Sequence, residues 1–178
     1  MILKKKFEQS IIFEPKVYHD NRGHFLEIFR ESQFAFLKKK FNFVQDNYSF
    51  SKKGVLRGLH FQKKNPQGKL LSVISGSIYD VIVDIRKKSK NFGKWQGFYL
   101  SGRKHSQIWI PPGFAHGFLS LENNSQIIYK CTEYYNPLFE EGILWNDSFL
   151  NIKWPKNIKL IISSKDKNLK KFSDLFKI

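Results

Sequence analysis

The sequence predicts an all-β protein, a sandwich or barrel of short strands, and three observations predict it. From Phe43 onward, short runs of β-branched and aromatic residues recur about every ten residues, with clusters of Gly, Pro, Asn and Ser between them. The chain holds 18 Phe and 4 Trp, an aromatic content that favours a strand-rich interior. Its 178 residues suffice for one domain with a hydrophobic core of its own.

Several strands are expected after Phe43. They span residues 69–75, 78–85, 95–100, 107–110, 116–121 and 125–131. Successive side chains of a strand point to opposite faces. In the second of these strands one face is apolar throughout, whereas the other alternates isoleucine with Asp80 and Asp84. This partly polar face is compatible with the wall of a cavity as well as with a dry core.

The N-terminal part of the chain predicts smaller elements. Strand-like pieces at 11–13 and 25–29 flank a polar turn at 19–24. Ser32 is placed to cap a short helix over 33–40.

The C-terminal tail from Ser163 has a helical pattern, with Ser164 as its cap. Its apolar stripe consists of Leu169, Phe172 and Leu175. No linker or repeat interrupts the chain. We therefore expect a single domain over residues 1–178, with a barrel core at about 43–147, N-terminal strands within 1–30 and a helical tail at 163–178.

The chain is strongly basic, with a net charge of +16, and only five of its 31 basic residues are Arg. The lysines occur in scattered runs, which is typical of a solvated surface or of a coding bias toward lysine. An anionic partner such as a nucleotide, a nucleic acid or a membrane surface is the other interpretation of the charge. The scarce arginines are the more informative residues.

The features that the sequence lacks indicate the cellular compartment of the protein. Cys131 is the single cysteine, so no internal disulfide can form and a reducing compartment fits. The N-terminus has no apolar run of signal-peptide length, and no stretch reaches the length of a membrane span. We expect a cytoplasmic protein that binds no membrane.

The stretch from Gly54 to Gly76 carries an Arg, a His and a Lys on two apolar strands joined by a polar turn. Arg57 and His60 are three residues apart, so a regular strand would point them to opposite faces. Gly58 lies between them, where a β-bulge would re-aim one of the two. If both face one cavity, the Arg can bind an anion and the His can move a proton.

His116 follows a Pro-Pro-Gly turn at the start of a strand, which resembles the second motif of cupin barrels. The first cupin motif has two histidines two residues apart and then a glutamate, whereas this chain has His60, Gln62 and Lys69. Gln and Lys are poor ligands for a divalent metal. The sequence therefore predicts a cupin-like barrel without a metal.

Tyr129 lies on an apolar strand soon after His116. Its phenol either packs in the core with a satisfied hydroxyl or faces the cavity and donates a proton. The local sequence does not choose between the two.

Short motifs are distributed along the chain, namely Asp20-x-Arg22-Gly23-x-Phe25-x-Glu27, Gln45-Asp46-Asn47-x-Ser49, Gly54-Val55-Leu56-Arg57-Gly58-Leu59-His60, Gln67-Gly68-Lys69-Leu70, Val83-Asp84-Ile85-Arg86, Trp109-Ile110-Pro111, Gly113-Phe114-Ala115-His116-Gly117-Phe118, Tyr129-Lys130, Trp145-Asn146-Asp147 and Ser164-Lys165-Asp166. Together, and in this order, these motifs resemble the dTDP-4-dehydrorhamnose 3,5-epimerase family, and the resemblance runs from about Phe13 to Asp166.

The resemblance implies a cupin-like jelly-roll β-barrel with short peripheral helices, a homodimer, and catalysis without metal or cofactor. The substrate would be dTDP-4-dehydro-6-deoxy-glucose. His60 would be the base, Tyr129 the opposing acid and Asp166 the carboxylate that orients His60. Lys69 would stabilise the enolate oxygen, with His116 close by.

The resemblance also implies residues that hold the nucleotide. Arg57 would contact the pyrophosphate, with Gln45 and Asn47 as neutral donors beside it. Arg22, Phe25 and Glu27 would reach the nucleotide from the neighbouring subunit. Tyr135 would stack on the base. The further contacts would be Glu140, whose assignment Glu141 makes ambiguous, and Lys165.

Three other functions compete with this one. The first is an epimerase for one centre only, or a ketoisomerase, acting on a related nucleotide sugar. The second is a metal-binding cupin. The third is a nucleic-acid binder, prompted by the charge, but the sequence has no helix-turn-helix, zinc-finger or ribonucleoprotein pattern.

Overall fold

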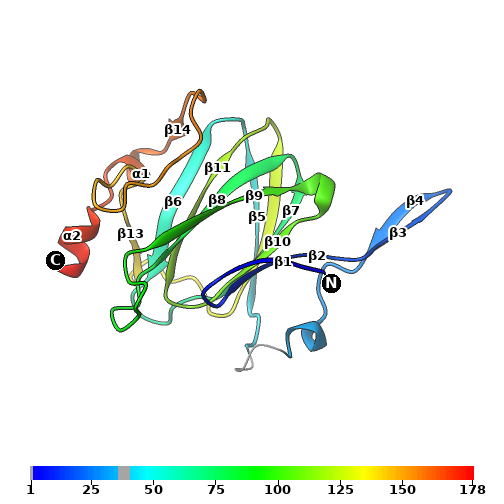
Figure 1. Ribbon diagram of the computed structural model, residues 1–178, viewed down its shortest axis with the longest axis horizontal. Helices are drawn as coiled ribbons and strands as arrows, with labels where there is room; N and C mark the ends of the chain where they lie inside the picture. Colours follow the sequence, from blue (N-terminus) through cyan, green and yellow to red (C-terminus); the bar gives the residue numbers. More distant parts are fainter. Residues whose placement is uncertain (1, 36–40) are drawn as a thin grey trace.

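Two six-stranded sheets make up the body of the computed structural model, which describes residues 2–35 and 41–178, with the backbone alone for 2–6 (Figure 1). In spatial order the first sheet consists of β1 (Ile2–Phe7), β2 (Ser10–Glu14), β10 (Gln107–Ile110), β7 (Lys69–Ser75), β12 (Ser125–Cys131) and β5 (Gln45–Ser51). The second consists of β13 (Glu140–Gly142), β6 (Val55–Gln62), β11 (Phe114–Ser120), β8 (Ser77–Asp84) and β9 (Trp95–Ser101), and β14 (Ile161–Ile162) pairs with β6. The all-β prediction is confirmed.

The remaining elements are small. A hairpin of β3 (Val17–Asp20) and β4 (Gly23–Leu26) projects away from the barrel as an arm (Figure 1). Its strands are short and its side chains mostly exposed, so the body of the protein packs little against it. The helical pieces are η1 (Glu31–Phe34), η2 (Gly102–Lys104), α1 (Ser164–Lys167) and α2 (Phe172–Phe176).

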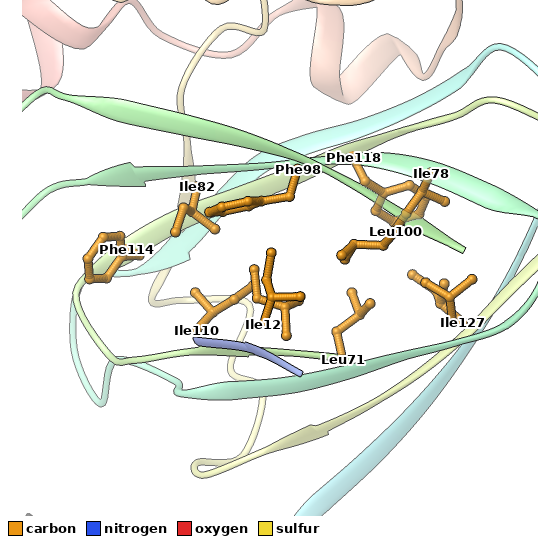
Figure 2. Close-up of a cluster of buried hydrophobic side chains, with 12 residues drawn as sticks. Ile12, Leu71, Ile78, Ile82, Phe98, Leu100, Ile110, Phe114, Phe118 and Ile127 are labelled. Carbon is orange, nitrogen blue, oxygen red and sulfur yellow. The ribbon is translucent and has the colours of Figure 1, made fainter. Parts of the chain in front are cut away.

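The main hydrophobic core lies between the two sheets, where the inward faces of their strands meet (Figure 2). Leu71 comes from the first sheet, and Ile78 and Ile82 come from β8 in the second. The same face of β8 carries Asp80 and Asp84, both fully buried. The partly polar face seen in the sequence is therefore the interior of the barrel.

Each sheet is also covered on its outer face. The second sheet packs through Tyr79, Val81 and Val83 against the C-terminal segments, including Phe172 of α2. The first sheet packs through residues such as Trp109 against a smaller aromatic cluster that contains Phe34, Phe41 and Phe43. Both covers are apolar, which explains why the outward faces of these strands are apolar in the sequence.

Several expected elements differ from the structure. The barrel begins before residue 43, because β1 and β2 join β10 in the first sheet. β1 was not expected, since half of its residues are lysine. The hairpin turn is tighter than 19–24, because β3 runs to Asp20 and β4 starts at Gly23.

The two expected helices are also corrected. Near Ser32 the structure has one 3₁₀ turn, η1, in place of the start of a helix, and residues 36–40 of that expected helix lie outside the described residues. The tail forms two short helices instead of one. The N-cap of the first is Ser163, whose hydroxyl accepts a hydrogen bond from the backbone N–H of Asp166, and not Ser164.

Phe172 offers a test of the outer cover. Its ring is fully buried among Phe92, Phe149 and Phe176. Phe172→Ala should lower the free energy of unfolding by about 3–5 kcal/mol, because the deleted ring leaves a cavity. Phe149→Ala, which removes a ring of the same cluster that is 59% exposed, should cost about 1 kcal/mol. Equal losses in denaturant titrations would contradict this view of the cover.

Candidate active site

A β-bulge between β6 and β11 sets the direction of Arg57 and His60. His60 pairs with His116 and Arg57 with Phe118, so two residues of β6 lie opposite the single residue Gly117. Gly58 has a φ of +109°, and a Cβ on it would lie 2.6 Å from the Cα of Gly117. Glycine therefore permits both the backbone conformation and the close approach. The bulge at Gly58 predicted from the sequence is confirmed.

Because of this bulge, Arg57 and His60 line the same cavity. It has a volume of about 670 Å³, with Lys69, His116 and Tyr129 also in its wall. A second cavity of about 280 Å³ shares three lining residues with the first, namely His60, Lys69 and Tyr129. The two cavities are lobes of one site that meet at these three side chains.

The three shared side chains come from opposite walls. His60 lies on β6 of the second sheet, whereas Lys69 on β7 and Tyr129 on β12 belong to the first. A group bound at the junction therefore has the imidazole on one side and the phenol and the amine on the other.

His60 is held by Asp166. The ring nitrogen Nε2 lies 2.7 Å from Oδ1 of the carboxyl, and Oδ2 accepts a hydrogen bond of 3.2 Å from the backbone N–H of Gly58. Asp166 is only 4% exposed, and it reaches this position because Ser163 caps the short helix that carries it. One carboxyl thus fixes both the imidazole and the bulge.

The surroundings of Asp166 keep it ionised. Burial alone would raise the pKa of its carboxyl, but the hydrogen bond from His60, the charge of that ring, the N–H of Gly58 and the charge of Lys165 together hold the pKa below its ordinary value. An ionised carboxylate can only accept, so Nε2 of His60 carries the proton that it shares with Asp166. In the neutral ring the free lone pair is then on Nδ1.

His116 is part of a second histidine–aspartate pair. Its Nε2 lies 2.7 Å from Oδ2 of Asp80, and both residues are buried. The other oxygen of Asp80, Oδ1, is buried without a hydrogen-bond partner among the described residues. Asp80 lies on the partly polar strand face that was seen in the sequence, but the sequence did not assign it to the site. The feature that could have identified it is a carboxylate at an inward position of an apolar strand.

The first sheet contributes a cation and a phenol. Burial lowers the pKa of the Lys69 amine, although the negative charges available at Cys131, Asp80 and Glu140 oppose that shift. Burial raises the pKa of the Tyr129 phenol, as do Cys131 and Glu140, against the effect of Arg57. The phenol is therefore protonated at neutral pH, as a proton donor must be.

The second lobe contains most of the other expected binding residues. Gln45, Asn47, Tyr135 and Glu140 line it, whereas Arg57 and Lys165 line the first lobe. The resemblance implied that Gln45 and Asn47 lie beside Arg57. In the structure they lie on the far side of the junction from it. They are hydrogen-bonded to each other, from Nε2 of Gln45 to Oδ1 of Asn47 at 2.9 Å.

Glu140 connects the two lobes. Its Oε2 accepts hydrogen bonds from the hydroxyl of Tyr135 at 2.7 Å and from Nζ of Lys165 at 2.5 Å. Burial would raise the pKa of Glu140, but these two bonds and the charges of His60 and Lys165 hold it below its ordinary value. Glu141 points to a different set of partners, Lys63 and Lys170. The ambiguity between the two glutamates is therefore resolved in favour of Glu140 as the residue that lines the site.

The arm residues are not brought to this site within one chain. Arg22 is paired with Asp20 near the tip of the β3–β4 hairpin, and Phe25 is 71% exposed. Glu27 binds Arg30 and Gln33 beyond the hairpin.

Two kinds of feature are absent from the described residues. Residues 2–35 and 41–178 contain no group of three or more His, Cys, Asp or Glu side chains arranged to hold a metal ion. The same part of the chain contains no helix long and apolar enough to cross a membrane.

The arrangement suits the removal and return of a proton beside a carbonyl group. An imidazole with a free lone pair can take the proton, a cationic amine can hold the developing oxyanion, and a phenol can return a proton from the opposite wall. A family model described as dTDP-4-dehydrorhamnose 3,5-epimerase matches residues 4–174. The chain belongs to this family. It is thus an isomerase by family.

Curated relatives agree with the family model. A dTDP-4-dehydrorhamnose 3,5-epimerase of Methanothermobacter thermautotrophicus is 49% identical over 170 residues, which cover 94% of this chain and 92% of the relative. One of Shigella flexneri is 47% identical over 175 residues, which cover 97% of this chain and 96% of the relative.

Solved structures of the family have the same fold. The Legionella pneumophila epimerase in complex with dTDP-4-keto-L-rhamnose superposes with a TM-score of 0.92 at 46% identity, covering 96% of this chain and 92% of that one. The Bacillus anthracis epimerase, with TDP and pyrophosphate bound, has a TM-score of 0.91 at 42% identity, covering 97% and 99%. The predicted cupin-like jelly-roll barrel is confirmed.

The lowered pKa of Asp166 predicts how stability depends on pH. Because the folded carboxyl has a pKa below its unfolded value of about 3.9, its ionisation stabilises the fold above that pH, and this contribution disappears as the pH falls through the folded value. Asp166→Asn should therefore lower the free energy of unfolding by about 1–3 kcal/mol at pH 7, and by progressively less below about pH 4. Guanidinium titrations from pH 7 to pH 3 measure this.

The exposed Asp174 provides the control. Asp174→Asn should change the unfolding free energy little at any pH. A difference between wild type and Asp166→Asn that stays constant down to pH 3 would show that the ionised carboxylate contributes nothing.

Proposed function

We propose that this protein epimerises dTDP-4-dehydro-6-deoxy-D-glucose at C3 and C5 to give dTDP-4-dehydro-L-rhamnose, as a step of dTDP-L-rhamnose biosynthesis. Membership of the family supports the reaction. The observation that carries the mechanism is the placement of His60 and Tyr129 on opposite walls of one cavity. An inversion needs a base on one side of the sugar and a proton donor on the other.

Each epimerisation would proceed in two proton transfers. Nδ1 of His60 takes the proton from the carbon beside the C4 ketone, and the electron pair of the C–H bond moves into an enolate. The ammonium of Lys69, with His116 nearby, holds the enolate oxygen. Tyr129 then gives its phenolic proton to the opposite face of the carbon. The scheme moves protons only, and needs neither a metal nor a cofactor.

Asp166 supports the base in this scheme. By accepting from Nε2 it presents Nδ1 toward the sugar, and its negative charge stabilises the imidazolium that forms when His60 takes the proton. His116 of β11 and Asp80 of β8 form a similar pair on the two strands that follow β6 in the sheet.

The two lobes would divide the rest of the substrate. Arg57 and Lys165 supply the positive charge of the first lobe, which suits a pyrophosphate. Tyr135 is 48% exposed in the second lobe, so its ring is accessible for stacking on the base, with Gln45, Asn47 and Glu140 around it. The ligands of the Legionella and Bacillus proteins, a dTDP-sugar and TDP with pyrophosphate, are of the same class.

We also propose that the chain is a single cytoplasmic domain that works as a homodimer. The β3–β4 arm exposes Tyr18 and Phe25, which are 53% and 71% accessible in one chain. A partner subunit would cover them and would receive Arg22, Phe25 and Glu27 at its nucleotide. No nucleic acid or membrane partner is included in this proposal.

A single-centre epimerase is the second candidate. A 3'-monoepimerase of Streptomyces bikiniensis shares the fold with a TM-score of 0.92, at 27% identity. A closely similar barrel can therefore belong to an epimerase that acts at one centre only.

Deuterium wash-in tests the reaction and its residues. In heavy water, wild type acting on dTDP-4-dehydro-6-deoxy-glucose should place label at both C3 and C5, read by mass spectrometry and proton NMR. His60→Ala should reduce exchange at both carbons by about 10²–10⁴-fold, because the base is gone. Lys69→Met should reduce it by about 10²–10³-fold, because the oxyanion loses its cation.

Tyr129→Phe separates the two steps. It should still exchange a proton through His60 but form inverted product about 10²-fold or more slowly. Label at one carbon only in wild type would establish the single-centre enzyme, and no exchange by folded protein would sink the proposal.

Subunit complementation tests the arm. His60→Ala and the double variant Arg22→Ala/Glu27→Ala should each be nearly inactive as homodimers. If the arm serves the partner's site, random exchange of equal amounts makes half of the dimers hybrids, each with one intact site, so about a quarter of wild-type activity should return. No recovery despite proven subunit exchange would mean that the arm acts within its own chain or not at all.

A further inference from the structure

The loop that carries Tyr135 has few apolar anchors. This segment, residues 132–139, connects β12 to β13 and is called the platform loop below. Tyr134 is 70% exposed and Leu138 is 87% exposed, so neither is packed in the core. A loop whose apolar side chains are mostly exposed has many accessible conformations. Something other than packing must define where the Tyr135 ring lies.

Hydrogen bonds from three glutamines hold the backbone of the platform loop. Oε1 of Gln45 accepts from the N–H of Tyr135 at 2.8 Å. Nε2 of Gln67 donates to the carbonyl of Glu133 at 2.9 Å. Gln62 binds on both sides of Tyr135, since its Oε1 accepts from the N–H of Asn136 at 2.7 Å and its Nε2 donates toward the carbonyl of Tyr134 at 3.4 Å.

Gln62 is the buried member of this set. It is 5% exposed, and its Nε2 also donates to the carbonyl of Asn65 at 2.9 Å. It therefore ties the platform loop to the 63–67 turn as well. Because its amide is removed from water, each of these bonds is costly to leave unmade.

Gln62 also borders the site. It lies two residues after His60 on β6 and lines the second lobe together with His60, Tyr135 and Glu140. None of the catalytic side chains makes a hydrogen bond to it among the described residues. Its bonds end on the backbone on both sides of Tyr135 and on the carbonyl of Asn65.

We propose that Gln62 is a positioning residue for recognition of the nucleobase, because its buried amide fixes the platform loop and thereby the ring of Tyr135. The proposal rests on the proposed function in one respect, the stacking of Tyr135 on the base. It assigns Gln62 no contact with substrate and no part in proton transfer. The second lobe is thus a binding surface whose position is fixed by the buried amide of Gln62.

The consequence is selective for one part of the ligand. The base contacts the platform loop, whereas the pyrophosphate contacts Arg57 in the first lobe. Loss of Gln62 should therefore weaken binding of a nucleotide but not of pyrophosphate. Interactions with the base are the same in the ground state and the transition state, so their loss raises KM with little change in kcat.

The test uses Gln62→Met, which keeps the length of the side chain but removes its donor and acceptor. Calorimetry at 25 °C should show that Kd for dTDP rises about tenfold, while Kd for inorganic pyrophosphate stays within twofold. KM for the dTDP-sugar should rise by a similar factor, with kcat within threefold. Gln96→Met is the matched control, because within residues 2–35 and 41–178 the Gln96 amide bonds only to the neighbouring carbonyl of Gly97.

A double-mutant cycle with Tyr135→Ala tests the stated route. If Gln62 acts through the Tyr135 ring, the double variant should bind dTDP no more weakly than Tyr135→Ala alone within about twofold. Additive losses would overturn the proposal. Equal weakening of dTDP and pyrophosphate would also overturn it, since that outcome indicates general damage to the barrel.

Gln67→Ala keeps the proposal testable if Gln62→Met does not fold. The Gln67 amide makes its bond to the loop at the surface, so its loss should not unfold the protein. It should weaken dTDP about two- to fivefold and leave pyrophosphate unchanged, and no change in dTDP binding would overturn the proposal. Failure of the proposed function is distinguishable, because wild type itself would then neither turn over the dTDP-sugar nor bind dTDP.

Discussion

The carboxylate of Asp166 is the interaction on which the rest of the site depends. One oxygen binds Nε2 of His60 and the other binds the backbone N–H of Gly58, so the same group orients the imidazole and holds the bulge that aims it. The carboxylate arrives from a helix of four residues at the far end of the chain. The C-terminal tail therefore does more than cover the second sheet. It completes a site whose other parts are on the barrel strands.

The pKa values of the ionisable groups in this site result from burial balanced by nearby charges. Asp166 and Glu140 are partly withdrawn from water, yet hydrogen bonds and cations keep both ionised. At Lys69 and Tyr129 burial outweighs the nearby charges, and it shifts each pKa toward the neutral form. The second sheet thus contributes His60, which lies beside an ionised carboxylate of the C-terminal tail. The first sheet contributes an amine and a phenol that burial shifts toward their neutral forms.

The sequence predicted what depends on local patterns and motifs. The strands at 107–110 and 125–131 were predicted to the residue, and Gly58 identified the bulge before any partner strand was known. The pairing of Asp80 with His116 was not predicted, because it depends on the register between two strands that are 36 residues apart. Nor could the sequence show that Gln45 lies across the junction from Arg57. Their relative position depends on how the two sheets face each other.

The hydrophobic core also determines how far apart the opposed walls of the cavity lie. Phe118 and Ile127 belong both to the core between the sheets and to the wall of the larger lobe. Facing sheets are held about 10 Å apart by the side chains between them, and here that gap also separates the imidazole from the phenol. The volume of the core thus sets the distance between the base His60 and the acid Tyr129. A change of volume at such apolar positions should therefore alter the reaction geometry as well as the stability.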